Sequence, residues 1–232
     1  MTGLEDGYDP SQQEVLVGPA FERVRQCHPL ADKKIIGEGS FSVLFEGETP
    51  SSIYRLSLDN ATHDFARRAK EMGLTGVVGM LQDYGAVAIY RDDQSDPDYL
   101  WLAHLERLAP LLPESDQYLA ISEIVEHLTG EEHGALVTDM DERLDILELI
   151  ATLRPSDHTK HALEAMLALL PDYVAKTDYD LSISNFMIRP ATGDVVLSDP
   201  VNGLSVVTAE HHTYLKGQAS KGAHFNDSAV IP

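Results

Sequence analysis

The first half of the chain consists of short apolar runs separated by Gly, Pro, Asp and Ser, a pattern typical of β-strands joined by turns. One longer stretch has the spacing of a helix, with Asn60 placed to cap it and Gly73 directly after its end. A shorter helix is expected within 13–26, interrupted near Gly18-Pro19. The pattern therefore predicts a helix at 61–72 and strands at 33–36, 42–48, 53–58, 86–91 and 99–105.

The second half of the chain changes to helical periodicity. Apolar side chains recur there every three or four residues, as they do from Leu163 to Leu170, which places them on one face of a helix. A short hairpin is predicted over 186–198 around the turn 190–194, and no regular element is predicted after Asp199. The predicted helices lie at 115–129, 141–153 and 157–176.

Strands followed by helices indicate an α+β fold in which a β-rich lobe precedes a short, mostly helical lobe. We expect an N-terminal extension at 1–30, a β-rich lobe at 31–105 and a helical lobe at 106–232. Residues 1–12 are polar and are expected to form a loose tail. The length of 232 residues suits two small lobes, and the sequence contains no internal repeat.

The chain is strongly acidic, with 17 Lys and Arg against 38 Asp and Glu and a formal net charge of −21. A field of this sign repels nucleic-acid phosphates, so direct binding of nucleic acid is not expected. The acidic residues keep the protein in solution, and mimicry of DNA to block a DNA-binding protein is an open alternative. The hydrophobic fraction of 43% indicates a chain that folds.

Several classes of protein are disfavoured by what the sequence lacks. No apolar run is long enough to span a membrane, and the first residues have neither the basic nor the apolar segment of a signal peptide. With Cys27 as the single cysteine, neither a disulfide framework nor a cysteine zinc site is possible. The histidines form no His-x₃-His pair with a general-base Glu, and no Gly-x-Ser-x-Gly sequence occurs. We expect a cytoplasmic protein without membrane contact.

A glycine-rich motif, Gly37-Glu38-Gly39-Ser40-Phe41-Ser42-Val43, lies between two predicted strands. Glycine lets the backbone approach a ligand closely, and consecutive N–H groups can cradle a phosphate. Gly-x-Gly also occurs in ordinary hairpins, so a structural turn is the alternative. A dinucleotide-binding fold is disfavoured because a strand and not a helix follows the motif.

A second motif, Asp180-Leu181-Ser182-Ile183-Ser184-Asn185, is followed by the predicted hairpin and then by Asp199. The hairpin is expected to bring Asn185 and Asp199 together at its open end, where two oxygen ligands suit Mg²⁺. Asp180, at the same rim, is placed to accept a proton from a hydroxyl nucleophile. An Asx-capped turn at the base of a hairpin is the alternative interpretation.

These motifs and a strand bearing Arg55 follow the order found in protein kinases, and the sequence resembles that family. The resemblance is greatest to the early Ser/Thr protein kinases of T-seven-like bacteriophages. It is spread over 35–201, and the Asp-Pro-Val sequence, in place of the usual kinase Asp-Phe-Gly, is similar to the phage type. The residues that carry it are Ile36–Ser42, Ile53-Tyr54-Arg55-Leu56, Asp180–Ile188 and Ser198-Asp199-Pro200-Val201.

The resemblance implies a role for each matched residue. The chain from Gly37 to Val43 would cover the phosphates and the adenine of ATP. Glu106 and Leu108 would lie in the hinge, whose backbone binds the adenine edge, and Arg55 would contact phosphate. The resemblance further implies that Asp180 is the catalytic base.

Asn185 and Asp199 would, by the same resemblance, be the Mg²⁺ ligands. Arg55 stands where the family has Lys, and the planar guanidinium is a larger group than an ammonium. An acidic partner for Arg55 is expected on the helix at 61–72, with Glu71 slightly preferred over Asp64.

The leading hypothesis is a phage-type Ser/Thr protein kinase that uses ATP and Mg²⁺ to phosphorylate host bacterial proteins in the host cytoplasm. In the family this activity redirects host transcription and RNA processing toward infection. The alternative is a pseudokinase that binds and blocks a host protein, which Arg55 and the short chain after Asp199 favour, as does Ser182 in place of the catalytic-loop Lys. A small-molecule phosphotransferase shares the Asp-x₄-Asn and Asp pattern but usually has a larger helical lobe.

Overall fold

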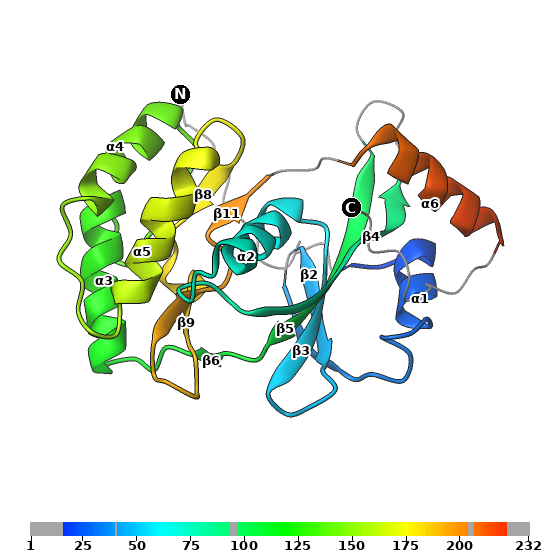
Figure 1. Ribbon diagram of the computed structural model, residues 1–232, viewed down its shortest axis with the longest axis horizontal. Coiled ribbons are helices and arrows are strands. Elements are labelled where there is room, and N and C mark those ends of the chain that lie inside the picture. Colours follow the sequence, from blue (N-terminus) through cyan, green and yellow to red (C-terminus); the bar gives the residue numbers. More distant parts are fainter. Residues whose placement is uncertain (1–15, 40, 93–96, 204–206, 222–232) are drawn as a thin grey trace, which may run out of the picture.

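The computed structural model describes residues 16–39, 41–92, 97–203 and 207–221. An antiparallel sheet dominates the first half of the chain, and helices with two small sheets make up most of the second half (Figure 1). The coarse expectation of a mixed helix and strand protein, with strands first and helices later, is therefore confirmed. The loose tail expected at 1–12 lies outside the described residues.

The main sheet has the strand order β1-β2-β3-β5-β4, and every neighbouring pair is antiparallel. All five predicted strands are present. The fourth begins earlier than predicted, at Met80, because its polar segment around Gln82 and Asp83 still pairs with the last strand of the sheet. The strands are β1 (Ile35–Glu38), β2 (Ser42–Glu46), β3 (Ser52–Ser57), β4 (Met80–Arg91) and β5 (Asp98–Glu106).

Helix α2 (Asn60–Met72) connects β3 to β4. Its cap is Asp59 and not Asn60, which is the first helical residue and is buried: an Asp59 side-chain oxygen accepts the N–H of Ala61 at 2.8 Å. Gly73 ends the helix as predicted, with a φ of 68° that glycine adopts without strain.

The two faces of the main sheet are covered by different parts of the chain. Helix α1 (Pro19–Arg25) packs Phe21 and Val24 onto one face, and Leu30 joins them in the same core. Much of the expected N-terminal extension is therefore part of the sheet's core. The opposite face meets α2 and the second half of the chain, because Ala103 and Leu105 of β5 pack in the core with these elements.

The helices of the second half follow the prediction closely. Their N-caps explain where they begin: Ser115 accepts the N–H of Tyr118 at 3.1 Å, and Asp139 accepts that of Asp141 at 2.8 Å. The segment predicted as one helix at 157–176 ends earlier, in a 3₁₀ turn (Leu170–Asp172) that contains Pro171. The helices are α3 (Asp116–Thr129), α4 (Met140–Ile150) and α5 (Lys160–Leu169).

Two three-stranded sheets of very short strands complete this region, with the orders β10-β9-β6 and β11-β8-β7. The predicted hairpin is confirmed, since β9 and β10 pair antiparallel with Leu197 opposite Phe186. One hydrophobic core contains residues of α2 and β5 together with α3, α4 and α5, so packing is continuous across position 105. The strands are β6 (Ala109–Pro110), β7 (Leu136–Val137), β8 (Asp178–Asp180), β9 (Phe186–Ile188), β10 (Val195–Leu197) and β11 (Val201–Asn202).

Helix α6 (Ala209–Lys221) was not predicted, because its sequence has little apolar periodicity. It lies against β4, far from α3 and α4 (Figure 1). Leu215 is buried with Ala86 and Tyr99, and a ring nitrogen of His211 lies 2.9 Å from the carbonyl oxygen of Ala86. None of the helices in the described ranges combines the length and apolar character that a membrane crossing requires.

Candidate active site

Arg55 is a buried cation on the face of the main sheet that meets α2. Its neighbours Tyr54 and Leu56 point into the core beneath α1, so Arg55 points the other way, beside Leu44 and Ala103 on the adjacent strands. The residue is 8% exposed, and its Nη2 atom has no hydrogen-bond partner among the residues that the structure describes. Burial of a charged nitrogen without a partner costs free energy, so the site favours a ligand that accepts this hydrogen bond.

The expected partners of Arg55, Glu71 and Asp64, are both wrong. Arg67 of the same helix binds Glu71 at 2.6 Å and also pairs with Asp64. Asp64 accepts a second hydrogen bond, from the hydroxyl of Tyr173 at 2.6 Å. Residues three and four positions apart meet on a helix surface, which is why Arg67 takes both carboxylates.

Asp199 lies where the chain leaves β10, and it is half-buried. Burial raises the pKa of its carboxyl group, and the nearby charge of Asp180 acts in the same direction. The charge of Arg55 and a hydrogen bond from the Thr62 hydroxyl lower the pKa of Asp199. The charges of Arg55 and Asp180 thus both act on the Asp199 carboxyl group.

Asp59 is a further carboxylate of this site that the sequence motifs did not include. It caps α2 and also accepts a hydrogen bond from the backbone of Gly203. Burial, followed by the charge of Asp199, raises the pKa of Asp59 to about 6, while Arg55 opposes this shift. Asp is a residue type that caps helices, and Asp59 follows shortly after the strand that carries Arg55. These two features are the signal that could have identified it.

The segment that carries Asp180 and Asn185 is held by local hydrogen bonds. The hydroxyl of Ser182 donates to Oδ1 of Asp180 at 2.6 Å, and the N–H of Ser182 donates to the same atom at 3.2 Å. Nδ2 of Asn185 donates to the carbonyl oxygen of Asp180 at 3.2 Å, which leaves the amide oxygen available for a cation. The N–H of Asp180 donates to Pro200 at 3.0 Å and ties this segment to the residue after Asp199.

Asn185 contacts Ser198, the residue before Asp199, at the open end of the β9–β10 hairpin. The carbonyl oxygen of Asn185 accepts both the N–H of Ser198 at 2.8 Å and its hydroxyl at 3.0 Å. One amide oxygen and one carboxylate are hard donors that fit Mg²⁺, which takes its remaining ligands from water and phosphate. Among the described residues, no group of three His, Cys, Asp or Glu could hold a metal ion.

The glycine-rich hairpin crosses the sheet edge next to Arg55. Gly37 on β1 lies opposite Leu44 on β2, and Leu44 lies opposite Arg55 on β3. The hairpin closes through the N–H of Gly39, which donates to the carbonyl oxygen of Ser42 at 2.8 Å. Its position supports the expectation that this backbone covers a ligand bound at Arg55.

The residues of the glycine-rich motif do not all face that ligand position. The Val43 side chain is fully buried in the core beneath α1, on the opposite face of the sheet, so its predicted contact with adenine is wrong. Side chains alternate along a strand, and Leu44 occupies the side on which Arg55 lies. Glu38 and Phe41 are exposed, and Ser40 lies outside the described residues.

Glu106 and Leu108, the expected hinge residues, lie at the end of β5. The Glu106 carboxylate accepts the N–H of Gly79 at 2.6 Å and binds Arg189 at 2.7 Å. Its own N–H donates to the carbonyl oxygen of Gly79 at 2.8 Å. Glu106 therefore ties β5 to the preceding strand and to the β9–β10 hairpin, and Leu108 packs against the main core.

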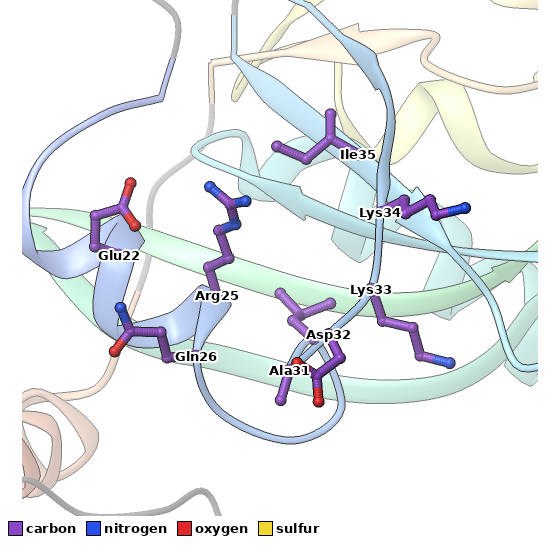
Figure 2. Close-up of a pocket in the computed structure, with 9 residues that line it drawn as sticks. Glu22, Arg25, Gln26, Ala31, Asp32, Lys33, Lys34 and Ile35 are labelled. Carbon is purple, nitrogen blue, oxygen red and sulfur yellow. The ribbon is translucent and has the colours of Figure 1, made fainter.

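An open hollow of about 790 Å³ lies elsewhere, between α1 and β1 (Figure 2). It is on the α1 side of the sheet, since Leu30 contributes to its lining. Its rim carries both signs of charge, with Arg25 and Lys34 near Glu22 and Asp32. It contains none of the residues predicted for the site, and we place the candidate site at Arg55 and Asp199.

Comparisons with known proteins give distant structural similarity alone. No protein-family model matches the chain. No curated protein matches it. Among solved structures, the choline kinase LicA from Streptococcus pneumoniae aligns with 14% identity over 84% of this chain and 78% of that chain, with a TM-score of 0.29. This TM-score is too low to establish a shared fold.

Proposed function

We propose that the protein is an ATP-dependent phosphotransferase whose site lies between the glycine-rich hairpin, Arg55 and Asp199. The observation that carries the proposal is the buried guanidinium of Arg55, whose Nη2 has no partner in the described part of the chain, while the charges of Asp59 and Asp199 interact with it. A nucleotide phosphate pairs with the positive charge of Arg55, and the divalent cation that accompanies the phosphate pairs with the negative charge of the carboxylates.

The arrangement of elements supports a protein-kinase-like site. A glycine-rich hairpin precedes the strand with Arg55, helix α2 follows that strand, and the Asp180 and Asp199 segments meet it from the second half of the chain. The sequence motifs further favour a phage-type kinase that modifies Ser or Thr of host bacterial proteins. In that proposal the backbone after Glu106, up to Leu108, binds the adenine edge.

The chemistry assigns each residue a distinct task. A hydroxyl oxygen of the acceptor forms a bond to the γ-phosphorus of ATP while the bond to the bridging oxygen breaks, and ADP leaves. Asp180 accepts the proton of that hydroxyl, and Ser182 orients Asp180 through its 2.6 Å hydrogen bond. Arg55 neutralises phosphate charge, a contribution that operates chiefly through electrostatics.

Asn185 and Asp199 would hold Mg²⁺. The ion supplies charge neutralisation and orientation of the phosphates when bound. The amide oxygen of Asn185 and the half-buried carboxylate of Asp199 provide the few protein ligands that Mg²⁺ requires.

Calorimetry with Mg²⁺ and a non-hydrolysable ATP analogue tests the binding step. We expect the wild type to bind and Arg55→Met to lose roughly tenfold or more in affinity, because a charge-assisted hydrogen bond contributes about 1.5–3 kcal/mol. Arg68→Met is the control, since Arg68 lies on α2 but pairs with Asp172 at the surface. A wild type that binds no adenine nucleotide with Mg²⁺ present overturns the proposal.

Labelled ATP tests the transfer step. We expect purified protein to label itself or proteins of a bacterial lysate, and Asp180→Asn to reduce the rate by roughly 10² or more through loss of the base. Asp194→Asn, in the turn of the β9–β10 hairpin, is the matched control and keeps the wild-type rate. Nucleotide binding without any transfer would favour the alternative of a pseudokinase that acts by binding a host protein, which the guanidinium at Arg55 also favours.

A further inference from the structure

The first turn of α2 holds the chain segment that begins at Asp199. The Thr62 hydroxyl contacts a carboxylate oxygen of Asp199 and lies 2.9 Å from the carbonyl oxygen of Val201. Asp59, the N-cap three residues earlier, lies near the backbone of Gly203, which lowers the pKa of this carboxyl group. The first turn of α2 and its cap thus adjoin Asp199, Val201 and Gly203, which are distant in the sequence.

Thr62 is the central group of this contact. It is 2% exposed, and its hydroxyl also lies 3.4 Å from Oδ2 of Asp59. A hydroxyl carries a single proton and donates it to one acceptor at a time, and a carboxylate is a stronger acceptor than a carbonyl. The Thr62 hydroxyl therefore donates its hydrogen bond to Asp199, and this bond fixes the position of Oδ1.

We propose that Thr62 is the positioning residue of Asp199, and that α2 is coupled to the site through this hydroxyl and not through an ion pair with Arg55. The inference rests on the proposed function. No carboxylate of α2 is left for Arg55, because Arg67 binds both Asp64 and Glu71. The hydroxyl fixes Oδ1 of Asp199, and no hydrogen bond engages Oδ2 within the described part of the chain, so that oxygen is free for the cation.

Loss of the Thr62 hydroxyl should weaken the magnesium-dependent part of nucleotide binding. Groups that orient a metal ligand typically change metal affinity by 10–100-fold when removed. Thr62→Val keeps the shape of the side chain and removes the donor, whereas Thr62→Ser keeps the donor. Thr159→Val is the matched control, since Thr159 is equally buried but bonds to Ser156, away from the site.

The experiment is titration calorimetry of a non-hydrolysable ATP analogue, with Mg²⁺ and with EDTA, together with urea unfolding of each variant. We expect Thr62→Val to lose about tenfold or more in affinity with Mg²⁺ and less than about twofold in EDTA. Thr62→Ser should retain the magnesium dependence of the wild type, and Thr159→Val should lower only the stability.

Two results separate the possible failures. If the wild type binds the analogue and Thr62→Val binds it equally well, or loses affinity equally with Mg²⁺ and with EDTA, the positioning role is wrong and the proposed function stands. If the wild type binds no analogue under either condition, the proposed function fails, and the role of Thr62 fails with it.

Discussion

At the scale of single residues, the candidate site is defined by charged groups that the fold buries wholly or in part. Arg55 is buried, with no hydrogen bond at Nη2 from the described residues, and Asp59 and Asp199 are carboxyl groups whose pKa values burial raises. Sites of this kind are destabilising in the absence of a ligand, and natural proteins tolerate them where function needs them.

Substitution of Asp59 should change how stability depends on pH. Its pKa is about 6 in the folded protein against an ordinary value of 3.8, so the folded protein binds this proton more tightly than the unfolded chain does. The resulting stabilisation is fully present below about pH 4 and is lost as the pH rises through about 6. Asn also caps helices, so Asp59→Asn removes the charge while keeping the cap.

We therefore expect the free energy of unfolding of Asp59→Asn, relative to that of the wild type, to rise by about 2 kcal/mol from pH 4 to pH 7.5. The shift corresponds to about 1.4 kcal/mol per pKa unit. Urea unfolding at the two pH values measures the difference. Hydrogen bonds from Lys33 and His63 lower the pKa values of Glu48 and Asp83. The contribution of these two groups to stability therefore changes with pH in the opposite direction, but equally in both proteins. A constant difference between the two proteins would contradict the assignment.

At the scale of elements, short strands and loops hold the Asp180 segment in place. β8 pairs with β7 on one side and with β11 on the other, which brings Leu136 and Val201 beside it. The N–H of Leu181 donates to Ala135 at 3.0 Å, so the chain before β7 lies directly against this segment. A close backbone contact of this kind leaves no room for a side chain.

Gly134 is the residue where that contact occurs, and Gly134→Ala should be strongly destabilising. Its φ is 73°, and an added Cβ would lie 2.0 Å from the carbonyl oxygen of Leu181. Gly130→Ala is the matched control, because Gly130 has a similar φ of 76° but open space around it. We expect a loss of about 1 kcal/mol for Gly130→Ala and about 3 kcal/mol or more for Gly134→Ala, measured by urea unfolding. Equal losses would show that the close approach contributes nothing.

Arg189 connects three elements and should also contribute to stability. It donates to the carbonyl oxygens of Thr75 at 2.7 Å and Val77 at 3.1 Å, and it binds Glu106. Arg189→Met removes the donor to the partly buried carbonyl oxygen of Val77 and breaks the ion pair with Glu106, so we expect a loss of about 2–3 kcal/mol. Arg68→Met, which breaks a more exposed pair with Asp172, should cost less than about 1 kcal/mol.

The measurement for Arg189 is a double-mutant cycle with Glu106→Gln under urea unfolding. Because the two side chains are in contact, the two substitutions should not be additive. Additive effects, or an Arg189→Met loss no larger than that of Arg68→Met, would show that this connection is not important.

At the scale of the whole molecule, the net charge of −21 opposes folding through self-repulsion. Salt screens this repulsion, since the screening length is about 10 Å at 0.1 M. Salt also weakens the exposed ion pairs, but each of these contributes little to stability. The loss of repulsion should therefore be the larger effect of salt.

The protein should therefore become more stable when NaCl is raised from about 0.05 M to about 0.5 M. A rise of the melting temperature in thermal unfolding is the expected result. A neutral osmolyte at equal osmolality is the control for effects other than screening. A melting temperature that falls with NaCl would show that attractive pairs, and not repulsion, dominate the electrostatic energy.

The sequence by itself determined the elements whose causes are local. The strands from Ile35 to Glu106, the end of α2 at Gly73 and the β9–β10 hairpin follow from side-chain alternation, turn residues and caps, which act between near neighbours in the chain. The hairpin also placed Asn185 beside the residue that precedes Asp199, because antiparallel pairing fixes which residues meet.

Tertiary structure alone decided which groups surround Arg55. Arg67 binds the carboxylates that were expected to pair with Arg55. The Val43 side chain points into the core beneath α1, and Thr62 contacts Asp199, which lies 137 positions away in the sequence. α6 likewise packs on the main sheet through the single buried Leu215 and a contact of His211 with Ala86, which give its sequence no apolar period. These outcomes depend on how distant segments pack, and local patterns carry no information about which distant charge or hydroxyl becomes a neighbour.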